Sequence, residues 1–151
     1  MKHRIVSTRL LVKAHPTHVY KFIENMENHR QIVPGVSDWA GDKDSARYSV
    51  RLGLARQKAE TRITERVIGL RICEESVISS PCPYRRWYKI QADEHTCILE
   101  IAMECDMSPL QRFLLAPVFK GQIERMLKNI KAVMEKPKEA ARPAPVASAP
   151  A

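Results

Sequence analysis

The sequence lacks any long apolar run, although 44% of its 151 residues are hydrophobic. No segment approaches the ~18 consecutive apolar residues of a membrane-spanning helix. The polar start, Met1 to Val6, passes directly into a strand-like pattern, so we expect no signal peptide. The length is sufficient for one domain with a hydrophobic core. We therefore expect a cytoplasmic protein whose four cysteines are reduced.

The usual signatures of metal and nucleic-acid binding are also missing. The cysteines form no C-x-x-C pair, and the five histidines do not recur at metal-ligand spacing on any expected helix or strand. Aromatic residues make up 6% of the chain, and none is interleaved with basic residues in a pattern that would stack bases. We expect no metal site, no cofactor and no nucleic-acid partner.

Acidic residues are fewer than basic ones, 17 against 25, which gives a net charge of +8. Residues 136–151 carry +2 of this charge, so the remainder carries +6. Such a balance permits contact with an acidic partner or a membrane surface. From residue 137 onward the chain is mostly Ala, Pro, Val and Ser, which predicts a disordered tail over 137–151 after one domain over 1–136. The patterns assign no oligomeric state.

A long amphipathic helix is expected from Ser108 to Glu135. Ser108 suits the N-cap position, and Pro109 suits the first helical turn. One face of this helix is apolar at a period of 3.6 residues. Its members are Ile123, Met126, Leu127, Ile130 and Val133. A helix of this length needs a large apolar surface to lie on, and only strands can supply that surface here.

Alternating apolar residues predict a strand over residues 4–14. A short helix is expected from His15 to Met26, followed by a helical turn over 29–33. Six further strands are expected over 36–40, 46–54, 57–68, 70–79, 84–92 and 96–107. Consecutive strands with short turns favour an antiparallel sheet with one wet face. The pattern predicts an α+β fold in which a curved sheet of about seven strands wraps around the last helix, with a cavity between them.

Three short motifs carry a family resemblance. His15–Ile23 resembles the opening helix of the START-like (SRPBCC) superfamily, Ile32–Val36 its hydrophobic-Pro-Gly-Val segment, and Met107–Leu114 its strand-to-helix junction in bacterial members. The resemblance covers residues 4–135. The superfamily includes the polyketide cyclase/dehydrase group, the Coq10-like proteins and the carbon monoxide dehydrogenase G-subunit group. The resemblance implies the helix-grip fold. Cys105 and Met107 stand where Coq10-like proteins tend to have aromatic residues, so ubiquinone binding is not carried over.

Polar residues on the expected inner face are candidates for ligand binding. Glu65 lies on the apolar face of its strand, where a dry cavity would raise the pKa of its carboxyl. The alternatives are a register slip and a place at the open end of the sheet. Arg86 shares a face with Tyr88 and could pair with Glu65 or orient a ligand's carbonyl or carboxylate. The opposite register, with Trp87 inward, stays open.

The remaining candidates are apolar or small. Pro117 is expected to bend the long helix, and Gly121 either to leave room for a ligand or to allow close packing. The candidate ligand-binding set is Ala59, Thr61, Ile63, Glu65, Arg86, Tyr88, Leu99, Ile101, Met103, Pro117 and Gly121. We expect binding of an apolar small molecule or a lipid-like ligand. The alternatives are a cyclase/dehydrase-type enzyme that uses Glu65, Arg86 and Tyr88, and an interaction module that uses the basic face of the sheet.

Overall fold

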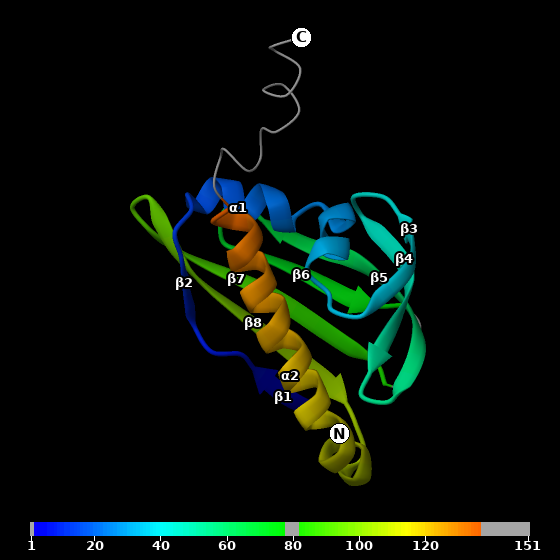
Figure 1. Ribbon diagram of the computed structural model, residues 1–151. Coiled ribbons are helices and arrows are strands. Elements are labelled where there is room, and N and C mark those ends of the chain that lie inside the picture. The colour runs from blue at the N-terminus through cyan, green and yellow to red at the C-terminus, as the bar shows by residue number, and fades with distance from the viewer. Residues whose placement is uncertain (1, 78–81, 137–151) are drawn as a thin grey trace.

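The computed structural model describes residues 2–77 and 82–136 (Figure 1). The expected tail over 137–151 lies outside these residues. The strands are β1 Lys2–Val6, β2 Leu10–Val12, β3 Val36–Gly41, β4 Ser45–Leu52, β5 Ala55–Val67, β6 Arg71–Ser76, β7 Tyr84–Asp93 and β8 Thr96–Asp106. The helices are α1 Pro16–Ile23, the 3₁₀ helix η1 Met26–Gln31 and α2 Pro109–Met134. None of the helices in these ranges is long and apolar enough to cross a membrane.

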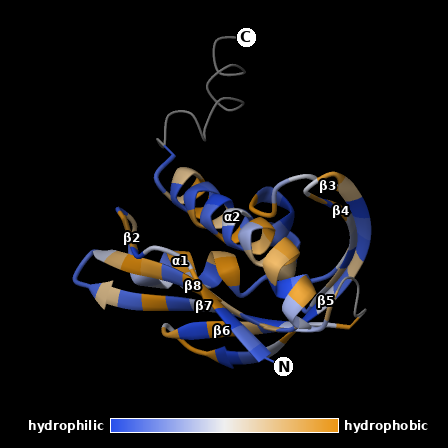
Figure 2. Ribbon diagram, turned by 90° about the horizontal axis from the view of Figure 1, so that it is seen from below, coloured by the Kyte–Doolittle hydropathy of each residue, from blue (hydrophilic) through white to orange (hydrophobic). Residues whose placement is uncertain are grey.

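All of these strands belong to one antiparallel sheet in the order β1-β8-β7-β6-β5-β4-β3, with β2 also paired to β8. The sheet curves, and α2 lies across its concave face (Figure 1). Apolar and polar residues alternate along the strands below the helix, as Figure 2 shows. The predicted α+β helix-grip architecture, with two short helices after the first strands, is confirmed.

The first predicted strand is in fact two. β1 ends at Val6 and β2 begins at Leu10, and both pair with β8. Between them, the Ser7 hydroxyl accepts a hydrogen bond from the Ile101 N–H at 2.9 Å. The Ser7 side chain thereby takes the place of a backbone carbonyl as the acceptor for β8. This substitution interrupts the regular backbone pairing with β8 between β1 and β2.

The long helix begins as the sequence predicts. The Ser108 hydroxyl accepts a bond from the Gln111 N–H at 3.2 Å, and the Gln111 side chain accepts one from the Ser108 N–H at 3.0 Å. This is a capping box, which satisfies two backbone donors that the helix leaves unpaired. The face that packs on the sheet is buried and comprises Phe119, Ile123, Met126, Leu127 and Ile130.

The register of β7 is resolved by its pairing with β8. Arg86 lies opposite Met103 and Tyr88 opposite Ile101, so both side chains point toward α2. Trp87 therefore lies on the outer face, with the guanidinium carbon of Arg4 5.7 Å from its ring centre. The alternative register, with Trp87 inward, is excluded.

The expected inward placement of Glu65 is wrong. The pairing of β5 with β6 shifts between Ile63 and Glu65, which is a β-bulge that reverses the alternation of side chains. The Glu65 side chain is 45% exposed, and it accepts a bond from Arg71 Nε at 3.0 Å on the outer surface. The buried acid is Glu74 of β6, directly opposite Arg86.

Candidate functional site: a buried polar cluster behind a surface groove

A buried ion pair lies at the centre of the sheet's inner face. Arg86 Nη1 on β7 is 3.3 Å from Glu74 Oε1 on β6, and the two side chains are 2% and 1% exposed. Each occupies an inward position of its strand: Arg86 lies between Tyr84 and Tyr88, and Glu74 lies between Ile72 and Ser76. Burying an ion away from water costs on the order of several kcal/mol, and an oppositely charged partner is needed to offset this cost. The two charges compensate each other here.

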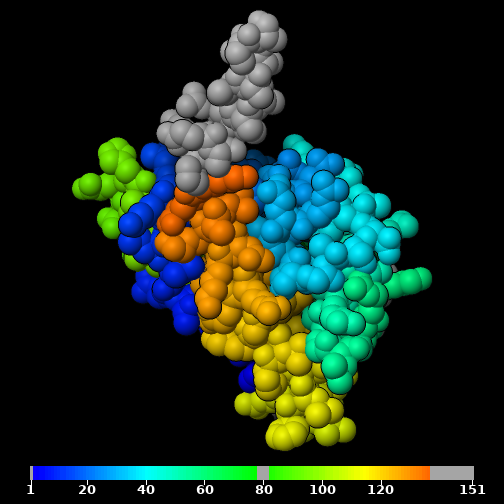
Figure 3. Space-filling view, viewed as in Figure 1, coloured from blue at the N-terminus to red at the C-terminus, as the bar shows by residue number. Residues whose placement is uncertain are grey.

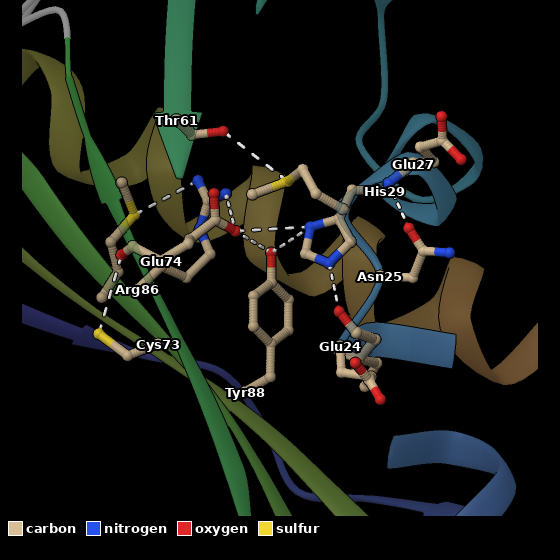
Figure 4. Close-up of polar contacts among 12 residues, drawn as sticks. Glu24, Asn25, Glu27, His29, Thr61, Cys73, Glu74, Arg86 and Tyr88 are labelled. Carbon is tan, nitrogen blue, oxygen red and sulfur yellow. Dashed lines mark hydrogen bonds and ion pairs between the residues drawn. The ribbon is translucent and has the colours of Figure 1, made fainter. Parts of the chain in front are cut away.

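Two further side chains surround the Glu74 carboxylate (Figure 4). The Tyr88 hydroxyl donates a hydrogen bond to Oε1. His29, from the 3₁₀ helix η1, directs its Nε2 to the Ile23 carbonyl at 2.7 Å. A carbonyl can only accept, so Nε2 carries a proton. The other ring nitrogen, Nδ1, then faces Glu74 at 3.7 Å and the Tyr88 hydroxyl at 3.5 Å.

The cluster fixes the charge of its members at neutral pH. Burial alone would raise the pKa of Glu74, but the charge of Arg86 and the contacts with His29 and Tyr88 outweigh it and lower this pKa to about 2. Burial lowers the pKa of Arg86, yet Glu74 raises it well above its ordinary value. Burial and Glu74 raise the pKa of Tyr88. The result is an ionised pair beside a neutral phenol.

Arg86 also connects the cluster to α2. Its Nη2 donates to Gln122 Oε1 at 3.1 Å and lies 3.9 Å from Met103 Sδ. The buried Nε of the same guanidinium has no hydrogen-bond partner among the described residues. Buried polar groups in native structures are nearly always hydrogen-bonded, so an unpaired donor here requires an explanation.

A groove of about 360 Å³ lies above Gln122. It runs between the middle of α2, the two-residue turn that joins β4 to β5, and the loop before β3, beside the yellow part of α2 in Figure 3. Its lining is Pro34, Gly35, Arg51, Leu52, Gly53, Pro117, Val118, Gly121, Gln122 and Arg125. A Cβ added at Gly121 would meet no atom within 4 Å, which shows open space above this part of the helix.

The structure divides the predicted site residues into four groups. Arg86, Tyr88 and Met103 meet in the buried cluster, and Thr61 lies near it with its hydroxyl 3.9 Å from Met26 Sδ. Pro117 and Gly121 line the groove. Leu99 and Ile101 are fully buried core residues, and Ala59 and Ile63 pack against the core while partly exposed. Glu65 is outside, as described above.

Three residues of the cluster were missed by the sequence analysis. Glu74 shares an alternating face with Ile72, but Glu75 follows directly, and the sequence does not show which of the two glutamates faces inward. Gln122 is three residues after Phe119 and four before Met126, so helical spacing alone could have found it. His29 stands between Asn28 and Arg30 in a polar segment, and no pattern marks it.

The basic face of the sheet is partly neutralised. Arg47 Nε lies 3.5 Å from Glu60, and Arg66 Nη2 lies 2.9 Å from Asp44. Arg66 also donates to the Glu24 carbonyl at 2.8 Å. These cations are engaged within the chain, which reduces the charge that the face offers to a partner. Across the described residues, no group of three or more His, Cys, Asp or Glu side chains could hold a metal ion.

A curved antiparallel sheet that holds one long C-terminal helix over a partly polar interior defines a START-like helix-grip domain. The chain belongs to the family described as polyketide cyclase / dehydrase and lipid transport, whose profile matches residues 3–135. No curated protein matches the sequence.

Several solved structures share the fold at low sequence identity. A START superfamily protein from Mycobacterium smegmatis aligns with a TM-score of 0.73 and 12% identity, over 89% of this chain and 98% of its own. Norcoclaurine synthase from Thalictrum flavum, in complex with dopamine and hydroxybenzaldehyde, aligns with a TM-score of 0.70 and 11% identity, over 88% of this chain and 86% of its own. The di-domain ARO/CYC StfQ from the steffimycin biosynthetic pathway aligns with a TM-score of 0.73 and 11% identity, over 93% of this chain and 52% of its own.

Proposed function

We propose that this domain binds a small, mainly apolar molecule that carries an uncharged oxygen acceptor at one end. The molecule enters through the groove and lies between the sheet and α2. One observation carries the proposal: Gln122, in the floor of the groove, bonds to a buried arginine whose Nε has no partner in the described part of the chain. The volume of the groove is within the range of about 300–1,000 Å³ that is usual for small-molecule sites.

The chemistry of the cluster supports a particular kind of polar end. The Gln122 oxygen accepts from one donor of Arg86, and an uncharged carbonyl oxygen of a ligand would accept from the unpaired Nε–H in the same way. Arg86 is already neutralised by Glu74, and a second buried anion would leave an uncompensated negative charge. A ketone, an ester or an amide therefore fits this position better than a carboxylate. The apolar part would lie against the side chains that line the groove and the core behind them.

A matched set of probes and variants tests this proposal. The probes are 2-acetylnaphthalene, 2-ethylnaphthalene and 2-naphthoate, which share an apolar body and differ in the polar end. Wild-type protein should bind the ketone with saturable stoichiometry and about fivefold more tightly than the hydrocarbon, the fold-change that corresponds to one net hydrogen bond of about 1 kcal/mol. The carboxylate should bind more weakly than the ketone.

Two substitutions at Gly121 supply the control. Gly121→Phe should fill the groove and reduce ketone binding at least about tenfold, since added volume in open space meets little strain. Gly121→Ala adds one methyl group and should leave binding unchanged. If the Phe variant folds and still binds the ketone like wild type, the groove is not the entrance. Native mass spectrometry of protein purified from its own host would then show whether any ligand co-purifies.

A second candidate function is catalysis of the cyclase or dehydrase kind. The observation that favours it is the contact of Glu74 with both the Tyr88 hydroxyl and His29 Nδ1, beside a guanidinium that would polarise a carbonyl. Because its pKa is lowered to about 2, Glu74 would remain ionised and serve as a charge partner for Arg86 and Tyr88, since so acidic a group neither donates nor readily accepts a proton at neutral pH. Turnover of a poly-β-carbonyl compound that falls in Tyr88→Phe, with binding retained, would support catalysis. Binding without turnover in wild type would leave the first proposal.

A further inference from the structure

The first turns of α2 expose an apolar face. Leu110, Phe113 and Leu114 follow the i, i+3, i+4 spacing that usually marks a buried stripe, yet they are 67%, 77% and 57% exposed. Leu54, in the turn between β4 and β5, is fully exposed at 102%. We call these four residues the apolar tip. Scattered exposed leucines are normal, but a group on neighbouring elements marks an interaction surface.

The two elements of the apolar tip lie side by side. A Cβ added at Gly53, next to Leu54, would lie 3.9 Å from the Val118 side chain of α2. The start of α2 and the β4–β5 turn also adjoin in the ribbon and in the space-filling view (Figures 1 and 3). Gly53, Pro117 and Val118 all line the groove. Leu54 and Leu114 therefore lie at the mouth of the groove, while Phe113 faces away from it and lines a separate pocket with His3 and Met107.

The charge around the apolar tip is positive. Arg112 lies next to Phe113, and Arg51 and Arg125 line the adjoining groove. All three are exposed, and none of them forms an ion pair with a described residue. From Pro109 to Ile123, α2 contains no acidic residue. Its first acid, Glu124, accepts bonds from the Thr8 N–H at 2.7 Å and the Thr8 hydroxyl at 2.8 Å, and so turns toward the start of the chain.

We propose that the apolar tip docks the protein on a lipid bilayer that contains anionic lipids. Leucine and phenylalanine side chains would enter the boundary between headgroups and acyl chains, while the three arginines contact lipid phosphates. A self-complementary contact between two copies would instead bring arginines of like charge together, in a protein with a net charge of +8. When the protein is docked in this way, its groove would open toward the bilayer. The proposal goes beyond ligand binding and does not depend on it.

Vesicle co-sedimentation of the full chain tests the docking. The vesicles are phosphatidylcholine alone, or phosphatidylcholine mixed with phosphatidylserine. Wild-type protein should bind the mixed vesicles more tightly, and added salt should weaken this binding. Phe113→Ser combined with Leu114→Ser should reduce binding about tenfold or more, because two large side chains no longer insert. Arg112→Gln should reduce it about fivefold, the fold-change for about 1 kcal/mol per basic residue at such a surface.

Controls separate the apolar tip from general surface properties. Ile68→Ser removes an equally exposed apolar side chain, 85% accessible, from the turn between β5 and β6, and should bind vesicles like wild type. Circular dichroism verifies that each variant is folded. Equal binding to both vesicle types, or unchanged binding by the Phe113 and Leu114 double variant, would overturn the proposal. The proposal would also be overturned if the wild-type protein dimerised in solution without binding vesicles, and if the same double variant abolished the dimer. Probe binding is measured without vesicles, so a failure here leaves the ligand proposal untouched.

Discussion

The two halves of α2 carry the same kind of apolar spacing with different outcomes. From Phe119 to Ile130, the apolar residues are buried on the sheet. From Leu110 to Leu114, the apolar residues face solvent beside the β4–β5 turn. Pro117, between these two stretches, and Gly121, on the exposed side of the second one, line the groove. A periodic apolar face predicts that a helix forms, but the reach of the sheet decides which part of that face is covered. The uncovered part borders the proposed entrance.

The largest loss of stability is expected from a charged substitution in the buried half of α2. Ile130→Asp would place an unpaired charge in the core and should lower the free energy of unfolding by about 4–5 kcal/mol, or prevent folding. Leu114→Asp, in the exposed half, should change it by less than about 0.5 kcal/mol. Urea denaturation measures both. Equal losses of unfolding free energy at the two positions would mean that the two halves of α2 are equally buried, contrary to the structure.

The next effect concerns the buried ion pair. Arg86→Met leaves Glu74 as an uncompensated buried charge and should destabilise the fold by about 3–5 kcal/mol. Adding Glu74→Gln in the same chain should restore a large part of that loss, since neither charge then remains. Chemical denaturation of the two single variants and the double variant forms a mutant cycle. Additive losses would show that the pair does not act as a unit.

The same pair should make stability depend on pH. The pKa of Glu74 is about 2 in the folded protein, against 4.5 for the free group. Its contribution is therefore fully present above about pH 5 and is lost as the pH falls toward 2, with a total of roughly 3 kcal/mol. Unfolding free energies of wild type and Glu74→Gln, measured across this range, should converge at low pH. Parallel curves would contradict the lowered pKa.

The sequence predicted the fold better than the site, for a physical reason. Alternation and helical spacing identify which face of an element is apolar, and these patterns correctly predicted α2, most of the strands and the inward position of Leu99, Ile101 and Met103 on β8. A single bulge between Ile63 and Glu65 was enough to turn the predicted acid Glu65 to the outer face, because residues beyond a bulge change face. The inward acid is Glu74 on the neighbouring strand, where adjacent glutamates left the inner face undecided. His29 reaches the cluster from a short 3₁₀ helix, whose position depends on tertiary packing.

Smaller effects are expected in the groove, where two glycines should respond with opposite signs. Gly121→Ala should stabilise the protein by about 0.5–1 kcal/mol, because the helix gains a better helix former and the methyl group meets open space. Gly35→Ala should destabilise it, since Gly35 has a φ of +72° and a Cβ there would lie 3.3 Å from the Arg51 side chain. Thermal unfolding distinguishes them, and destabilisation by Gly121→Ala would show that the groove is closed at that point.

The most direct measurement is the NMR signal of the Arg86 side-chain Nε–H during titration with 2-acetylnaphthalene. A buried guanidinium that receives a ligand oxygen should show a large, saturable shift of this resonance, assigned by its loss in Arg86→Lys. The hydrocarbon 2-ethylnaphthalene should produce a much smaller shift, because it has no acceptor. A saturable shift from the ketone alone is the predicted result. Saturable binding of both probes with an unmoved Arg86 signal would contradict the role given to the arginine and to the groove above it.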